Sequence, residues 1–358
     1  MKILHISSLR TKANGIYSVL STLSKEQQLL GNDVRIINVF KNNSVEDNNI
    51  CDISSIFDFV KLIKEFKPHI VIFHSLYIYQ YILFYHCLKF FQIPYSIQLH
   101  GALSQENYKT GKIKKYIANL VFYNKFIKKA KNIIYLNQDE YLNSIVRNIN
   151  PQFSIIPNGC YLSKKNNDLN KQQDILNILY LGRISIHHKG LDILLDAIKN
   201  LINDNLSNKF HITLYGLGLE ADTTWLINKL KDFPKDIISF KGPIYGKEKD
   251  YVFRSSHIFI LTSRYEGMPM GILEALSYGL PCILTPGTNL SNEIEKYKAG
   301  WKTDLTSKDI AKTIKESLDE YRKNKERYIE NAIFMASQYS WNKIAMHSIN
   351  EYKKLLSK

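Results

Sequence analysis

The chain has 358 residues, of which 45% are hydrophobic, and a formal net charge of +15. This length exceeds one typical hydrophobic core and predicts two domains. The four cysteines are scattered, with no CxxC pair and no histidine at ligand spacing, which excludes a disulfide framework and a zinc site and favours a reducing cytoplasm. The first residues enter an apolar run without a signal-peptide core, so we expect no export.

Short apolar runs alternate with amphipathic stretches through the first 165 residues. Residues 16–30 have a helical pattern that closes at Gly31. The alternation predicts a parallel, doubly wound sheet. The strand-like runs are 3–6, 34–40, 70–73, 95–99, 133–136 and 153–156.

Residues 69–88 contain no Asp, Glu, Lys or Arg and are long enough to suggest a membrane span. Three histidines, a serine, a glutamine and several tyrosines interrupt the segment. This polarity favours a buried strand followed by an aromatic helix.

Basic charge is concentrated in the first 165 residues, which hold 21 Lys and Arg against 10 Asp and Glu (+11), while residues 166–358 hold 27 against 23 (+4). Residues 109–131 contain eight lysines and no acidic residue, with apolar residues at helical spacing. This pattern predicts a basic amphipathic helix on an anionic membrane surface, although a solvated face in a lysine-rich protein explains it equally well. Nucleic acid is not expected, because lysine dominates over arginine and no recognised module is visible.

The strand and helix alternation repeats after a junction at residues 157–159 and a polar, linker-like stretch at 163–174. A helical pattern begins at Leu191. The second half therefore predicts another parallel sheet. Its strand-like runs are 178–181, 211–215, 237–240, 258–261 and 282–285.

Two cationic residues flank the loop between the strand 178–181 and the helix that follows it. Arg183 follows this strand directly, residues 184–188 suggest a further extended stretch, and Lys189 precedes the helix. Ligands bind at the carboxyl ends of parallel strands, where a guanidinium and an ammonium suit a diphosphate. Each residue taken alone could instead be a solvated surface charge. Only eight of the 48 basic residues are arginine, which favours a specific role for Arg183.

Two glutamates, Glu266 and Glu274, lie eight positions apart around a Gly/Pro-rich turn. On one continuous helix they would be about 12 Å apart along the axis, which excludes a compact pair of hydrolase carboxylates. Pro269 suits the first turn of a helix and Gly279 its end, so Glu266 is predicted in the loop and Glu274 inside the helix. The helix N-terminus between them would attract phosphate, and the glutamates would bind hydroxyl groups on either side. A nucleotide sugar has this layout.

Other sequence patterns indicate whether the protein binds a dinucleotide cofactor or a metal ion. The Gly216-Leu217-Gly218 segment lacks the third glycine of a dinucleotide fingerprint, which argues against NAD. No Asp-x-Asp occurs, so we expect no bound metal, with the cationic residues and the helix N-terminus stabilising a leaving diphosphate instead. A lone histidine such as His100 is usually structural, but it follows a strand-like run and so would line the ligand-binding edge.

In order and spacing, these motifs resemble the donor domain of the family 4 retaining glycosyltransferases over about residues 176–300. The resemblance implies the α/β GT-B fold, with two Rossmann-like, doubly wound parallel-sheet domains facing a cleft. It implies an acceptor-binding, membrane-facing domain at 1–165 and a donor-binding domain at 166–340, with a helix at 341–358 crossing back. The matching segments are Gly182-Arg183, Lys189-Gly190, Tyr215-Gly216-Leu217-Gly218, Lys241-Gly242-Pro243, Ser263…Glu266-Gly267-Met268-Pro269…Glu274-Ala275-Leu276 and Gly279-Leu280-Pro281.

The resemblance also implies roles for single residues. Glu266, the first glutamate of the EX7E motif, would bind the donor sugar, and Glu274 the ribose. Arg183 and Lys189 would bind the diphosphate, and His100, in a His-Gly pair, would lie near the anomeric carbon. Further donor contacts would come from Gly15 (where Asn14-Gly15 replaces a usual double glycine), Gly216, Gly267, Met268, Pro269, Met270 and Gly271.

We therefore expect a metal-independent, retaining, hexosyltransferase-type enzyme, cytoplasmic and peripheral on the inner face of the cell membrane. Its donor would be a nucleotide sugar, with a UDP-sugar favoured over a GDP-sugar, and no further cofactor. Its acceptor would be a glycan, lipid-linked, for a bacterial surface polysaccharide such as lipopolysaccharide. The alternatives are a non-catalytic nucleotide-sugar binding or membrane-recruitment protein of the same fold, and a nucleotide-sugar epimerase.

Overall fold

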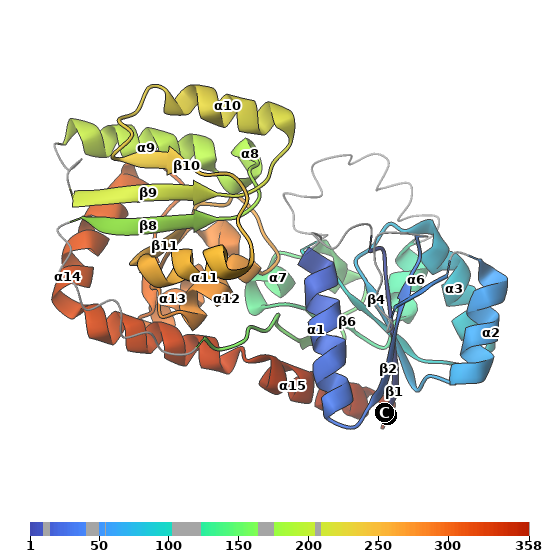
Figure 1. Cartoon of the computed structure of the whole chain (residues 1–358). Coiled ribbons are helices and arrows are strands. Elements are labelled where there is room, and N and C mark those ends of the chain that lie inside the picture. Colours follow the sequence, from blue (N-terminus) through green and yellow to red (C-terminus); the bar gives the residue numbers. More distant parts are fainter. Residues whose placement is uncertain are drawn as a thin grey trace. The chain divides into compact units, whose positions relative to one another are not determined.

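The computed structural model describes residues 1–9, 15–40, 50–53, 55–101, 123–163, 175–204 and 209–357. They divide into two compact units, Met1–Gly159 with Trp341–Lys358, and Cys160–Ser340 (Figure 1). Each unit contains one parallel sheet. The prediction of two parallel-sheet α/β domains is confirmed.

The first unit contains a seven-stranded sheet in the order β3-β2-β1-β4-β5-β6-β7, and every pair is parallel. Its elements are β1 (Lys2–Ser7), α1 (Gly15–Leu29), β2 (Asp33–Asn38), β3 (Ile50–Asp52), α2 (Ile56–Phe66), β4 (Ile70–His74), α3 (Tyr79–Phe90), β5 (Tyr95–Gln98), α6 (Asn124–Lys129), β6 (Ile133–Tyr135), α7 (Gln138–Leu142), η2 (Ile145–Asn148), β7 (Phe153–Ile155) and α15 (Trp341–Leu356).

Helices cover both faces of this sheet because the strand order reverses between β1 and β4. Right-handed crossovers then put α1 on one face and α2 and α3 on the other. Helix α15 packs beside α1 (Figure 1). On the opposite face Phe59 of α2 stacks on Phe84 of α3, with ring centroids 4.0 Å apart. All five residues of β4 are buried, as a central parallel strand requires.

The second unit contains a six-stranded parallel sheet in the order β10-β9-β8-β11-β12-β13. Its elements are β8 (Leu176–Leu181), α8 (Ile186–Lys189), α9 (Leu191–Asn203), β9 (Phe210–Tyr215), α10 (Glu220–Leu230), β10 (Ile238–Phe240), α11 (Gly246–Ser255), β11 (Ile258–Leu261), α12 (Met270–Ser277), β12 (Cys282–Leu284), η5 (Pro286–Thr288), α13 (Ser291–Tyr297), β13 (Gly300–Lys302) and α14 (Ser307–Gln338).

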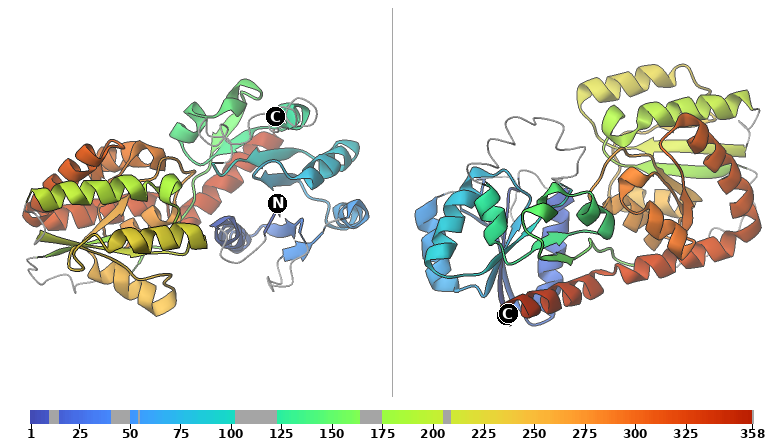
Figure 2. Two further views of the ribbon diagram at one scale, coloured as in Figure 1. Left: turned by 90° about the horizontal axis from the view of Figure 1, so that it is seen from above. Right: turned by 180° about the vertical axis from the view of Figure 1, so that it is seen from behind.

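The strand order of the second sheet reverses between β8 and β11. Helices α9 and α10 lie together on one face of this sheet, as the right-hand view of Figure 2 shows. The amphipathic pattern predicted from Leu191 onward is confirmed, since α9 buries Leu194 and Ile198. Ligands of such sheets bind at the carboxyl ends of the strands on either side of a reversal, here β8 and β11.

Three details differ from the sequence-based expectations. The strands β3 and β13 were not predicted, because three residues each are too short for a periodic signal. The stretch 184–188 is not extended: after a single bridge between Ile184 and Gly218 the chain forms the short helix α8. Pro269 is the N-cap of α12 rather than part of its first turn, because its ψ of 122° is extended.

The uncharged segment 69–88 forms the buried strand β4 followed by the aromatic helix α3, as expected. Among the described residues, no helix has both the length and the hydropathy needed to cross a membrane. Most of the lysine-rich stretch 109–131 lies outside the described residues, which resume at 123 with α6. The linker predicted at 163–174 lies outside them as well, apart from its first residue.

Candidate functional site

The candidate site lies at the carboxyl ends of β8 and β11 in the second unit, at the reversal of strand order. The loop after β8 carries Arg183 and Lys189, and the loop after β11 leads through Glu266 to α12. Hydrogen bonds join the two loops: Arg264 N donates to the His188 carbonyl at 2.9 Å, and Thr262 Oγ1 to the Lys189 carbonyl at 3.1 Å.

Gly190 allows these loops to approach each other. Its φ of 64° is left-handed, and a Cβ at this position would overlap the carbonyl oxygen of Thr262. The glycine ends α8 immediately after Lys189. The Lys189 side chain is thereby held beside the loop that follows β11.

An ion pair anchors the loop that follows β11. Arg264 donates through both guanidinium ends to the Asp192 carboxylate of α9, at 2.8 and 2.7 Å. Burial alone would raise the pKa of Asp192, but the hydrogen bonds and charge of Arg264 outweigh it, and the pKa is lowered. Asp192 is thus a charged anchor for the backbone that presents Glu266.

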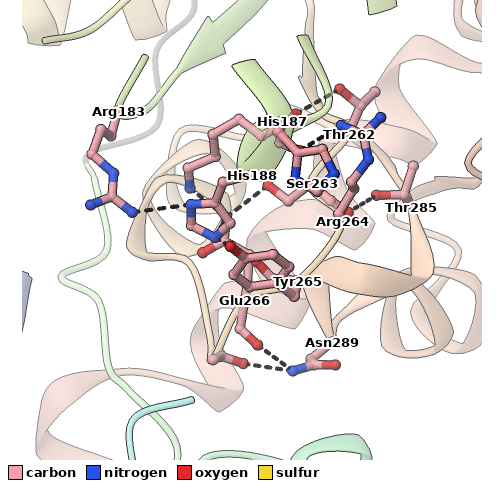
Figure 3. Close-up of polar contacts among 12 residues, drawn as sticks. Arg183, His187, His188, Thr262, Ser263, Arg264, Tyr265, Glu266, Thr285 and Asn289 are labelled. Carbon is pink, nitrogen blue, oxygen red and sulfur yellow. Dashed lines mark hydrogen bonds and ion pairs between the residues drawn. The ribbon is translucent and has the colours of Figure 1, made fainter. Parts of the chain in front are cut away.

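The centre of the site is a contact between Lys189 and Glu266. The ammonium of Lys189 donates to Glu266 Oε1, and Ser263 Oγ donates to the same oxygen at 2.7 Å. The two charged side chains are only 10% and 12% exposed. Asn289, with a left-handed φ of 58°, donates to the Glu266 carbonyl at 2.6 Å and so holds the backbone as well (Figure 3).

His188 links Arg183 to the loop of Glu266, a role that the sequence did not suggest. Its Nε2 donates to the Tyr265 carbonyl at 2.7 Å, so its Nδ1 is free to accept from the Arg183 guanidinium at 3.0 Å. Its ring stacks on Tyr265, with centroids 4.3 Å apart (Figure 3). Burial lowers the pKa of His188, with Glu266 opposing, and keeps the ring in the neutral form that this geometry needs.

Helix α12 carries Glu274 and begins beside β8. As predicted, Glu266 lies in the loop and Glu274 inside the helix. No side chain caps the first turn, and Ile272 N donates to the Pro269 carbonyl at 3.2 Å, so the start of the helix offers an anion the N–H groups of Met270 and Gly271. Gly271 lets this turn approach the Leu181 carbonyl, 3.0 Å from an added Cβ. Lys249 of α11 pairs with Glu274 at 2.7 Å, a partner that the sequence did not reveal.

A pocket of about 520 Å³ adjoins this region. Gly216, at the end of β9, brings the neighbouring loops together, since its N–H donates to the Gly242 carbonyl at 2.9 Å and a Cβ would overlap the Gly182 carbonyl. The pocket combines two tyrosines with lysines and apolar side chains. Its lining residues are Tyr215, Lys241, Pro243, Ile244, Lys247, Glu248, Tyr251 and Val252.

Two predicted site residues belong to the first unit and are not part of this cluster. Gly15 is the first residue of α1, and residues 10–14 before it lie outside the described part of the chain. His100 follows β5 with a left-handed φ of 52°, and its Nε2 lies 2.8 Å from Nδ1 of His74. Glu140 of α7 accepts from the next backbone N–H, that of Gly101, at 2.6 Å.

Comparison with known proteins identifies a family match in the second unit and several relatives of the chain. Residues 163–334 match the family "Glycosyl transferases group 1". Mannosylfructose-phosphate synthase of Agrobacterium fabrum is 29% identical over 113 residues, which are 30% of this chain and 25% of that protein. UDP-Gal:alpha-D-GlcNAc-diphosphoundecaprenol alpha-1,3-galactosyltransferase of Escherichia coli is 32% identical over 147 residues, 37% of this chain and 36% of that protein. The chain thus aligns with about a quarter to a third of the length of these relatives.

The whole chain is similar in structure to a glycosyltransferase from Rickettsia africae, with a TM-score of 0.75 at 17% identity, covering 99% of this chain and 98% of that one. Anabaena HepE in complex with UDP superposes with a TM-score of 0.77 at 15% identity, covering 99% of this chain and 100% of that one. This likeness shows the fold, which is GT-B. The family match covers residues 163–334, and the likeness in fold extends over the whole chain.

Proposed function

We propose that this chain, as a glycosyltransferase of the GT-B type with a group 1 domain, transfers a sugar from a nucleoside diphosphate donor to a glycan with retention of anomeric configuration. The observation that carries the proposal is the convergence of Arg183, Lys189 and Glu266 at the sheet reversal, beside the uncapped start of α12. Two cations and a helix N-terminus suit a diphosphate, and a carboxylate beside them suits sugar hydroxyls.

The diphosphate would bind between the two loops. Arg183 is exposed but tethered by His188, so its guanidinium is preorganised for a phosphate oxygen. Lys189 would share its ammonium between Glu266 and the second phosphate. Charge that develops on the departing diphosphate would meet these cations and the N–H groups of α12, which supplies the stabilisation needed for bond cleavage.

The nucleoside would extend toward Glu274 and the neighbouring pocket. Glu274 is one-third exposed, and Lys249 contacts both of its carboxylate oxygens, at 2.9 and 2.7 Å; each oxygen has a second lone pair that can accept from the ribose hydroxyls. The pocket that contains Tyr215 and Tyr251 offers aromatic and apolar surface for a base. We favour UDP over GDP as the carrier.

The reaction needs no metal in this proposal. A divalent cation normally bridges a diphosphate through carboxylates, and here the carboxylates of the site are committed to Lys189 and Lys249. The cationic side chains would lie where the leaving charge develops. The acceptor hydroxyl would attack from the face the diphosphate leaves, as in the resembled family, with His100 and Glu266 near the anomeric carbon.

We further propose a lipid-linked saccharide acceptor for a surface polysaccharide, and a peripheral position on the inner face of the cell membrane. The galactosyltransferase relative names a diphosphoundecaprenol-linked acceptor. The first 165 residues carry a net +11, and the described end of their lysine-rich stretch, α6, is basic in its last turn. Replacing Lys128 and Lys129 by Gln should weaken co-sedimentation with anionic vesicles, and unchanged co-sedimentation would remove this role.

The direct test is transfer by the purified protein. Isotope-labelled UDP-sugars would be incubated with undecaprenyl-diphosphate saccharides, and the anomeric configuration of the product read by NMR. We expect a donor whose anomeric bond is axial to give a product whose new anomeric bond is also axial. An inverted product contradicts retention, donor hydrolysis without transfer argues for another acceptor, and binding without turnover of any donor supports a non-catalytic protein.

A further inference from the structure

Three histidines of the first unit form a continuous hydrogen-bonded chain across adjacent strands. His5 lies on β1, His74 on β4, and His100 follows β5, and these strands are neighbours in the sheet. His5 Nδ1 is 2.9 Å from His74 Nε2, and His74 Nδ1 is 2.8 Å from His100 Nε2. Both His5 and His74 are fully buried. Water therefore does not compete for the nitrogens between them.

The other end of this histidine chain reaches α1 and α15. His5 Nε2 lies 3.0 Å from Oε1 of Gln27, and Gln27 Nε2 donates to Ser348 Oγ at 2.9 Å. Ser348 Oγ in turn donates to the Ala345 carbonyl at 2.7 Å. Gln27 and Ser348 are both fully buried, so this end of the path is inside the unit.

The Ala345 carbonyl sets the direction of every bond in the path, because a carbonyl can only accept. Ser348 has a single proton and gives it to this carbonyl, so its oxygen must accept from Gln27. The amide of Gln27 is thereby oriented with its nitrogen toward Ser348 and its oxygen toward His5. His5 must donate through Nε2.

The same alternation continues through the rings. A neutral imidazole has one donor and one acceptor nitrogen, so His5 accepts at Nδ1 from Nε2 of His74. His74 then accepts at its own Nδ1 from Nε2 of His100. His100 is left with a protonated Nε2 and an unprotonated Nδ1.

Burial keeps these rings neutral. It lowers the pKa of His5 and of His100 to about 4, and that of His74 well below its usual range, with the other histidines as a further cause for His74. An extra proton on His5 or His74 would also set two N–H groups against each other. The tautomer pattern therefore holds near neutral pH.

The backbone of His100 is fixed independently of its ring. A left-handed φ of 52° is costly for a residue with a side chain and persists where the surroundings enforce it. Glu140 supplies part of that constraint, since its carboxylate accepts from Gly101 N and Leu136 N, both at 2.6 Å. Ring and backbone are thus both held, as expected for a side chain that acts in one orientation.

We propose that His5, His74 and Gln27 are positioning residues that fix His100 as the Nε2–H tautomer, with Nδ1 presented as a hydrogen-bond acceptor to a sugar hydroxyl. The sugar as ligand rests on the proposed function. The tautomer does not, because it follows from the hydrogen-bond path alone.

Imidazole NMR tests the tautomer without any substrate. In long-range ¹H–¹⁵N spectra of histidine-labelled protein at pH 7.5, assigned with His100→Gln, His74→Gln and His5→Gln, we expect three Nε2–H rings. Ser348→Ala frees the Gln27 amide to turn, so it should produce a mixture of tautomers. Ser24→Ala removes a buried hydroxyl of α1 that lies outside the path, so it should leave the wild-type tautomer pattern unchanged.

Gln27→Leu provides a second disruption if Ser348→Ala fails to fold. A charged or Nδ1–H His100 in the wild type overturns the proposal. A wild-type pattern in the folded disrupting variants also overturns it.

Transfer kinetics then test whether the tautomer matters. Ser348→Ala should lower kcat about two- to tenfold, because only molecules with the correct tautomer are competent, while nucleotide affinity and Ser24→Ala kinetics stay at the wild-type level. Unchanged kcat in a variant with mixed tautomers refutes the positioning role. Absence of transfer in the wild type would refute the proposed function, while the NMR result still decides the histidine chain.

Discussion

The second unit contains two lysine–glutamate pairs that differ in burial, which gives a matched test of the site's electrostatics. Lys189 and Glu266 are 10% and 12% exposed, whereas Lys249 and Glu274 are 31% and 33% exposed. Two unit charges 4 Å apart attract by about 4 kcal/mol at an effective dielectric constant of 20. Lys189→Met leaves a nearly buried carboxylate with Ser263 as its donor, so we expect a loss of about 2–4 kcal/mol in unfolding free energy. Lys249→Met should cost about 1 kcal/mol or less, as exposed pairs do.

Differential scanning calorimetry would measure both losses. With a shift of about 2–4 °C per kcal/mol for a domain of this size, Lys189→Met should lower Tm by roughly 5–15 °C and Lys249→Met by about 4 °C at most. Adding Glu266→Gln to Lys189→Met should recover at least half of the loss, because the uncompensated charge is gone. Equal effects of the two lysine variants, or no recovery in the double variant, would refute this reasoning.

The remaining predictions concern catalysis and pH. Transfer should survive EDTA, because the cations of the site are side chains, and complete loss restored by Mn²⁺ would contradict this. Glu274→Gln should mainly raise the donor KM. Glu266→Ala and His100→Ala should each lower kcat by about 100-fold or more while nucleotide binding persists. Wild-type turnover in both Ala variants would contradict the site assignment. Burial raises the pKa of Glu140 from 4.5 to about 7, against the two N–H groups that favour its ionised form. Its stabilising contribution is therefore full below pH 4.5 and is lost as pH rises toward 7, by roughly 3 kcal/mol at most. The unfolding free energy of Glu140→Gln relative to wild type, measured from pH 4.5 to 8, should follow this curve, and a constant difference would contradict it.

The fold was largely predictable because parallel strands are buried on both faces and so form continuous apolar runs, as in β4 and β11. The helix α12 was predictable from Pro269 and Gly279, since both residues have strong backbone preferences. The strand β13 left no such signal. Its three residues are only half-buried, and its pairing to β12 depends on tertiary structure.

The supporting contacts of the site could not be predicted. His188 holds Arg183 because the short helix α8 turns its ring onto Tyr265, 77 residues away in the sequence. Lys249 meets Glu274 only because α11 and α12 are near each other in the fold. A helical lysine and a histidine in a loop-like segment are common in solvated positions, so neither gave a local signal.

The hydrogen bonds that join His5, His74 and His100 could not be predicted from the sequence either. His5 and His74 are separated by 69 positions, and they become neighbours because β1 pairs with β4 and not only with β2. One signal was present: all three residues lie in or directly after strongly apolar runs, where a polar ring needs a partner. Strand order was needed to identify that partner.

Calorimetric titration of nucleoside diphosphates tests the central claim, a diphosphate site at the reversal of the second sheet. UDP and GDP would be titrated into the wild type, Arg183→Ala and, as a control, Arg147→Ala, which removes an exposed arginine of the first unit. We expect UDP to bind with 1:1 stoichiometry. Its Kd should rise about 10- to 100-fold in Arg183→Ala, because one charge-assisted hydrogen bond is lost, and should stay unchanged in Arg147→Ala. Absence of binding by both nucleotides, or equal affinity in Arg183→Ala and wild type, would contradict the account.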